Sequence, residues 1–220
     1  MPRPYTLVLE TSTPAASLLL AGPDGIVMER EFSSDRSHNA ALFGPLSEVL
    51  EGIKPEQIAR ILVGSGPGSY SGTRVGIAAA QGIALAAGCP VVAVPSIMAA
   101  PSAANRGPCT IVGDARRGSF WISRVENLVI IREPELIEGA GPFSAELQGT
   151  EAVTFETHLK DPFPAGLTIL REIPTARLLW DAWQATLESE RARWEAEPPQ
   201  PMYLRPPHIT ESKRPWIGRL

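Results

Sequence analysis

The chain has few of the residues that build disulfide frameworks or helix-borne metal sites. Of its 220 residues only Cys89 and Cys109 are cysteines, too few for a disulfide framework and without the paired spacing of a zinc site. Its three histidines, His38, His158 and His208, are isolated, and none has another within five residues. Two imidazoles share a helix face at i, i+4 spacing, so a helix-borne histidine pair for a metal is excluded. This composition favours a reducing, cytoplasmic compartment.

The chain also lacks an excess of positive charge. It carries 20 Lys and Arg against 24 Asp and Glu, a formal charge of -4. This balance argues against a nucleic-acid-binding surface over the whole molecule, so any RNA contact is expected to be shared with another chain. No signal peptide is predicted at the N-terminus.

Charged residues are missing altogether between Arg74 and Arg106, a stretch long enough to cross a membrane. The stretch is rich in Ala and Gly, and it is interrupted by Gly88-Cys-Pro90, Pro95 and Pro101. These breaks favour helix, strand and helix in the core of a protein that does not enter a membrane.

A glycine-rich segment follows a short apolar run at 60–63 and precedes an Ala-rich stretch, which predicts strand, tight loop and helix. Ser71 or Thr73 is expected to cap the helix. The loop could hold an anion or another chain, or it could only reverse the chain direction. Its predicted structural residues are Gly64, Gly66, Pro67, Gly68 and Gly72.

Three well-known motifs do not match this loop. A Walker A loop needs lysine after its last glycine, but Gly72 is followed by Thr73 and Arg74. The Gly-x-Gly-x-x-Gly fingerprint of dinucleotide sites fails at its third glycine. Tyr70 occupies the place where a nucleophile elbow needs serine, so a hydrolase triad has no local support.

The order of predicted elements indicates an α/β fold with two lobes, divided into residues 1–104 and 105–220. Length permits one large domain or two lobes of about a hundred residues each. The N-terminal part predicts an antiparallel meander followed by helix, strand, helix, strand and helix. The expected ranges are strands at 5–10, 15–21, 26–32, 60–63 and 90–94, and helices at 38–52, after the glycine loop, and at 96–104.

Residues 105–220 are expected to open on a hairpin formed by 109–114 and 119–125. Further strands are possible at 128–131, 152–155 and 167–170. Thr175 is predicted to cap one long helix that runs to Glu197. The Pro-rich tail from 198 to 220 is expected to be extended and partly mobile.

Five motifs spread over both lobes resemble those of the TsaB (YeaZ) family. They are Leu9-Glu-Thr-Ser-Thr13, the segment Gly64 to Gly76, Ala79-Ala-Gln-Gly-Ile83, Asp114-Ala-Arg-Arg-Gly118 and Met202-Tyr-Leu-Arg205. The resemblance implies the actin-like ATPase (ASKHA, ribonuclease H-like) fold, with two lobes of mixed sheets flanked by helices. One departure is Glu10, where the family usually has Asp.

The resemblance also implies a role without chemistry of its own. The family is the non-catalytic subunit of the complex that makes threonylcarbamoyladenosine (t6A) in tRNA. It binds and activates a catalytic homologue, TsaD, which holds metal and nucleotide, and an ATPase, TsaE, joins them. TsaC supplies threonylcarbamoyl adenylate. No cofactor is then expected on this chain alone, tRNA is met only through the complex, and no membrane is involved.

Small residues on the helix after the glycine loop would let a second helix backbone approach closely, in a homodimer or in a complex with TsaD. The same residues could instead pack on this chain's own sheet. The predicted partner-binding residues are Leu42, Leu46, Val49, Arg74, Ile77, Ala80, Gln81 and Gly82. Arg74 and Arg116 could meet partner carboxylates or remain solvated.

The alternative is a stand-alone ATP-dependent phosphotransferase or hydrolase of the actin-like class. It would need phosphate contacts from the Thr11 turn and the Gly66 loop, and Glu10 or Asp114 to bind Mg²⁺. A metallopeptidase is the weakest reading because metal ligands at workable spacing are missing.

Overall fold

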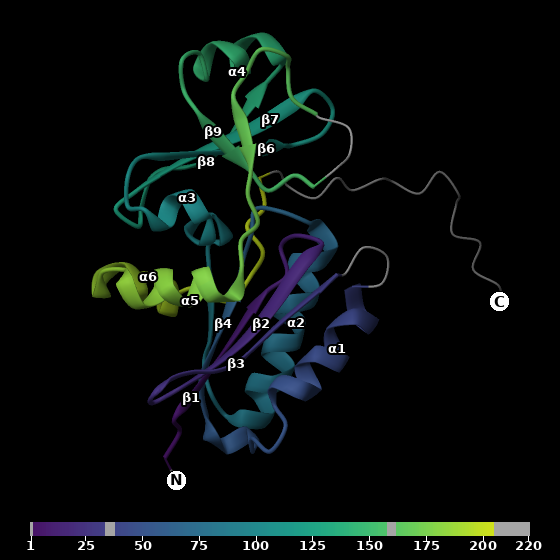
Figure 1. Cartoon of the computed structure of the whole chain (residues 1–220), viewed down its shortest axis with the longest axis vertical. Helices are drawn as coiled ribbons and strands as arrows, with labels where there is room; N and C mark the ends of the chain where they lie inside the picture. Colours follow the sequence, from purple (N-terminus) through teal and green to yellow (C-terminus); the bar gives the residue numbers. More distant parts are fainter. Residues whose placement is uncertain (1, 34–37, 158–161, 205–220) are drawn as a thin grey trace, which may run out of the picture.

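The computed structural model describes residues 2–33, 38–157 and 162–204, without the side chains of 38–40. Two five-stranded sheets form the two lobes, and the helices lie around and between them (Figure 1). Within the described ranges no helix is long and apolar enough to cross a membrane.

The first sheet has the strand order β3-β2-β1-β4-β5. Its strands β1, β2 and β3 form the predicted antiparallel meander, and β4 and β5 then join by parallel pairing. The bounds are β1 Tyr5–Glu10, β2 Ala15–Gly22, β3 Gly25–Ser33, β4 Ile58–Gly64 and β5 Val91–Val94.

Helices cover both faces of this sheet. Alternate residues of β1 point to opposite faces, so Leu7 and Leu9 pack with α1 (His38–Val49) and α2 (Tyr70–Ala87). Val8 instead packs with α5 (Ala176–Ala185) and α6 (Glu188–Ala196). The α1–α2 face and the α5–α6 face are therefore the two sides of one sheet (Figure 1).

Short elements complete the first lobe. They are the 3-10 helix η1 (Pro55–Gln57), the 3-10 helix η2 (Ser96–Ala99) and the short helix α3 (Pro101–Ala104). The last two replace the single helix expected at 96–104, because Pro101 starts a new turn after Ala100 takes an extended conformation.

The second sheet has the order β10-β9-β6-β7-β8, with β6, β7 and β8 antiparallel and β9 and β10 added in parallel. One face packs under α4, and the other continues into the core beneath the α5–α6 face. The bounds are β6 Cys109–Asp114, β7 Ser119–Glu126, β8 Val129–Glu138, α4 Ala140–Glu146, β9 Ala152–Thr154 and β10 Ile169–Arg171.

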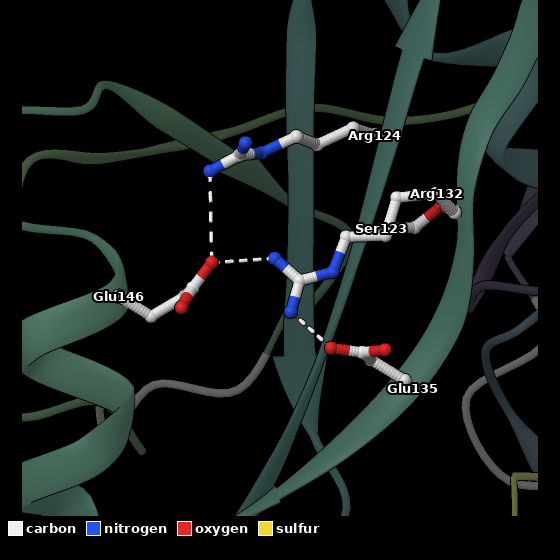
Figure 2. Close-up of polar contacts among 5 residues, drawn as sticks. All are labelled: Ser123, Arg124, Arg132, Glu135 and Glu146. Atoms are coloured by element: carbon white, nitrogen blue, oxygen red, sulfur yellow. Dashed lines mark hydrogen bonds and ion pairs between the residues drawn. The ribbon is translucent and has the colours of Figure 1, made fainter.

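Ion pairs fasten α4 to this sheet, as Figure 2 shows. The Glu146 carboxylate of α4 accepts from Arg132 of β8 at 2.5 Å and lies 3.7 Å from Arg124 of β7. Arg132 also pairs with Glu135, and Ser123 donates to the Arg132 carbonyl at 2.8 Å. Two guanidinium groups thus share two carboxylates, and the cluster fits a structural role.

The sequence did not predict α4, and one expectation for the C-terminal part is wrong, because the single long helix is two helices, α5 and α6. Thr175 does cap α5, accepting from the Leu178 N–H at 3.2 Å. The helix ends because Thr186 takes an extended conformation while its hydroxyl donates to the Ala182 carbonyl at 2.6 Å. After this break α6 folds back, and Trp194 meets Trp183 with ring centroids 6.2 Å apart.

Both helices pack on the first sheet, although the prediction placed the long helix in the second lobe. The Ala176 N–H donates to Ser17 of β2 at 2.8 Å, and Arg60 of β4 pairs with Glu195 of α6 at 3.1 Å. The chain therefore returns to its N-terminal sheet. The division at 104 and 105 stays a prediction, and of the predicted tail, residues 205–220 lie outside the described part.

Candidate functional site

The glycine loop connects the end of β4 to α2, as the segment predicts. Gly64 ends the strand, Gly66, Pro67 and Gly68 lie in the loop, and Gly72 lies in the first turn of α2. The Gly66–Pro67 peptide bond is cis. The helix cap is Ser69, which accepts from the Gly72 N–H at 3.2 Å, so neither Ser71 nor Thr73 has the predicted role.

The loop and α2 enclose a segment of the same chain. The Ser69 N–H donates to the Ser12 carbonyl at 2.6 Å. A Cβ at Gly72 would lie 2.2 Å from the Thr11 carbonyl oxygen, and one at Gly76 would lie 2.2 Å from the Thr11 hydroxyl. These distances are far below van der Waals contact, so glycine is required for α2 to approach the turn after β1. Two motifs of the predicted resemblance, Leu9 to Thr13 and Gly64 to Gly76, therefore pack against each other.

Glu10, at the end of β1, is completely buried beside this turn. Its Oε1 accepts from the Ser12 N–H at 2.7 Å, whereas its Oε2 and the Ser12 hydroxyl have no partner within the described ranges. Burial raises the pKa of Glu10, and the hydrogen bond from the Ser12 N–H only partly opposes this effect. A carboxyl in this setting tends toward the neutral form.

The carboxylates of the enzyme alternative lie in different surroundings. Glu10 is enclosed, and Asp114 accepts from the backbone N–H of Arg116 at 2.8 Å and pairs with its guanidinium at 3.1 Å. Among the residues that the structure describes, no three His, Cys, Asp or Glu side chains gather as a metal site. His158 and His208, like the His38 side chain, lie outside the described part.

Five of the predicted partner-binding residues face this chain's own core. Their exposed fractions do not exceed 7%, because they form the layer between the first sheet and its two covering helices. The helix stripe on which the prediction rested is the inward one, and a direct contact of these side chains with a partner stays a prediction. They are Leu42, Leu46, Val49, Ile77 and Ala80.

The outer surface of α1 and α2 carries large apolar side chains among small ones. Phe43 of α1 is 59% exposed and Leu85 of α2 is 88% exposed. Gly44, which follows Phe43, and Gly82, three residues before Leu85, are also exposed, and a Cβ added to either would meet nothing within 4 Å. We call this outer surface, with Phe43, Gly44, Ala78, Gly82, Leu85 and Ala86, the α1–α2 outer surface.

Arg74 and Gln81, both predicted to meet a partner, already contact the C-terminal segment of the chain. The Arg74 Nε donates to the Tyr203 hydroxyl at 2.9 Å, and Gln81 donates to the Pro199 carbonyl at 3.4 Å. The guanidinium carbon of Arg74 lies 3.7 Å from the centre of the Tyr70 ring. Sequence reasoning missed both tyrosines, although each lies within a motif of the resemblance.

The fold and the site define a class: a two-lobed α/β protein of the actin-like type whose glycine loop holds its own chain. Two solved structures from Pseudomonas aeruginosa share this fold. One is described as an uncharacterized protein with similarity to peptidase YEAZ (TM-score 0.68) and the other as YeaZ (TM-score 0.64). Both are 22% identical and cover 93% of this chain and all of their own. The predicted actin-like, two-lobed fold is confirmed.

A family model described as "TsaD: tRNA N6-adenosine threonylcarbamoyltransferase" matches residues 25–170, more than half of the chain, which therefore belongs to this family. Two curated relatives are named "tRNA threonylcarbamoyladenosine biosynthesis protein TsaB". The Escherichia coli relative is 33% identical over 122 residues, and the Haemophilus influenzae relative is 35% identical over 127. These matches cover 52% and 54% of this chain and about half the length of each relative, 52%. The predicted resemblance to TsaB (YeaZ) is confirmed.

Proposed function

We propose that this chain is a non-catalytic subunit in the biosynthesis of threonylcarbamoyladenosine in tRNA. In this role it binds and activates a TsaD-like catalytic homologue that transfers threonylcarbamoyl to an adenosine of tRNA. The proposal is supported by the relatives that are named TsaB. It is also supported by the α1–α2 outer surface, whose exposed apolar side chains suit a contact with another protein.

The α1–α2 outer surface supports docking by its shape and composition. Small exposed residues let a second pair of helices approach closely. Large exposed apolar residues then bury apolar area in the contact. Leu85 and Phe43 would be the apolar anchors, and Gly44 and Gly82 would leave room for the partner's backbone. A second copy of this chain would use the same surface when the partner is absent.

In this proposal ATP and metal are held by the partner subunits, a TsaE-like ATPase joins the pair, and tRNA is met through the complex. Glu10 supports the assignment, because a completely buried carboxyl with a raised pKa is poorly suited to an exchangeable Mg²⁺. The cytoplasmic compartment stays a prediction.

The experiment is co-purification of the full chain with the TsaD-like homologue of the same organism, followed by a sizing column. Leu85→Glu should abolish the complex, because it places a charge on the apolar surface, and the melting temperature should be nearly unchanged at a site that is 88% exposed. Leu187→Glu is the matched control: Leu187 is 63% exposed at the junction of α5 and α6, and its variant should bind like the wild type.

Activity gives the second measurement. The isolated chain should make no t6A, and product should appear only when the homologue, the ATPase and threonylcarbamoyl adenylate are supplied. Unaided product formation, or micromolar binding of Mg-ATP to the isolated chain in a calorimetric titration, would favour the enzyme alternative. An intact complex with Leu85→Glu would instead contradict the docking surface.

A further inference from the structure

Two motifs that are far apart in the sequence meet at one side chain. Arg74 belongs to the glycine segment and Tyr203 to the C-terminal Met202-Tyr-Leu motif, 129 residues away. The guanidinium of Arg74 contacts two rings, with its carbon 3.7 Å from the centre of Tyr70 and 5.3 Å from the centre of Tyr203, and the two ring centres are themselves 6.4 Å apart. We call Tyr70, Arg74 and Tyr203 the tyrosine clamp.

The clamp is anchored by both segments that form it. Tyr70 and Arg74 are four residues apart on α2 and so lie on one helix face. Tyr203 is fixed because the N–H of Met202 donates to the Ser65 carbonyl at 2.8 Å, and because Leu204 packs against the core. The backbone of the C-terminal segment is thereby joined to the loop that precedes α2.

The two tyrosines hold the exposed guanidinium of Arg74 without neutralising its charge. The Arg74 Nε is used by the Tyr203 hydroxyl, at 2.9 Å, and no carboxylate lies within ion-pair distance of Arg74 in the part of the chain that the structure describes. The ring contacts add cation–π attraction and hold the planar group in one orientation. An arginine that is already ordered loses less entropy on binding than a free one, which favours its use as an anchor.

Arg74 is also the only charged residue of α2. The other exposed residues of this helix are uncharged, and among them Ala78, Gly82, Leu85 and Ala86 belong to the proposed docking surface. A protein that covers this surface would desolvate the guanidinium, and burial of an unpaired charge is costly. A carboxylate on the covering protein removes that cost, because its two oxygens can accept side by side from the terminal nitrogens of the Arg74 guanidinium.

We propose that the tyrosine clamp is a pre-organised contact for a carboxylate side chain of the docking protein, and that the segment 199–204 is part of the docking surface. Arg74 makes the contact and Tyr203 is a positioning residue. This inference rests on the proposed function, because it concerns the same partner.

The experiment measures the dissociation constant between the full-length chain and the TsaD-like homologue by calorimetry at low and high salt. Arg74→Ala should weaken binding by roughly 30-fold, the size of a hot-spot arginine. Arg74→Lys should recover little of this loss, because an ammonium lacks the planar fork. Tyr203→Phe keeps the ring and removes only the hydroxyl, so it should weaken binding several-fold while the melting temperature stays unchanged.

The matched control is Arg177→Ala, which removes the same charge from α5 on the opposite face of the sheet. Arg177 pairs with Glu29 at 2.6 Å and should not affect binding. Salt should weaken the wild-type complex more than the Arg74→Ala complex, because only the former contains the ion pair.

The failures of the two proposals can be told apart. A wild-type chain that does not bind the homologue would overturn both. Wild-type binding together with unchanged binding by Arg74→Ala and Arg74→Lys would overturn the clamp and leave the docking function in place. A loss confined to self-association would assign the clamp to a contact between copies and would also overturn the proposal.

Discussion

The two helix-covered faces of the first sheet differ in what their helices leave exposed. The α5–α6 face is closed: Trp183 and Trp194 are buried there, and their core continues into the second sheet. The α1–α2 face has its own core beneath the helices, but on the outside it exposes Phe43 and Leu85. One face therefore holds the two lobes together, and the other leaves large apolar side chains on the surface, where we propose that a partner docks.

The α5–α6 face should tolerate truncation least. Trp183→Ala removes a side chain that is 2% exposed from the core shared by both sheets, and it should lower the free energy of unfolding by about 3–5 kcal/mol. Urea denaturation measures this value. Leu187→Ala, at an exposed position between the same helices, should change it by less than about 0.5 kcal/mol. A similar small change for Trp183→Ala would mean that this core does not join the lobes.

The inner and outer sides of α2 can be compared by one substitution made twice. Gly76→Ala would place a Cβ 2.2 Å from the Thr11 hydroxyl and should destabilise the protein by about 1–3 kcal/mol. Gly82→Ala meets nothing within 4 Å and should stabilise it by about 0.5–1 kcal/mol, the helix preference of Ala over Gly. Thermal or urea unfolding measures both. Equal effects would contradict the close approach of α2 to the turn after β1.

The smallest net effect is expected at Glu10, below the glycine loop, and it should depend on pH. Because burial raises the pKa of Glu10 above its ordinary 4.5, the folded chain holds this proton more tightly than the unfolded chain. The contribution of the Glu10 proton to the free energy of unfolding is then fully present below pH 4.5, and it is lost as the pH rises through the folded-state pKa. Glu10→Gln should raise the melting temperature at neutral pH, with a gain that shrinks toward pH 4.5. A pH-independent difference would mean that this carboxyl keeps its charge on folding.

The α/β layout follows from local patterns, and so does nearly every strand. The apolar runs of β1, β2 and β4 and the turn at 22–25 are short-range signals, and the structure confirms them. The break between α5 and α6 was not visible, because the sequence from Thr175 to Glu197 has no proline or glycine. It depends on Thr186 taking an extended conformation and on Trp194 returning to Trp183.

The candidate site was predicted less well than the fold. The glycine order identified the loop and the family resemblance, but the small-residue stripe of α2 has two sides that look alike in sequence. Only packing on the first sheet assigned Ile77 and Ala80 to the inside and Gly82 and Leu85 to the outside.

By itself the sequence determined most strands, the glycine loop and the absence of a paired-histidine site, because each depends on residues that are close in the chain. The tertiary structure decided which neighbour the glycines accommodate and where Arg74 points. Both depend on contacts between segments separated by more than 60 residues, Thr11 with Gly72 and Arg74 with Tyr203. Local periodicity carries no information about such pairs, since they form only when the sheets and helices have packed.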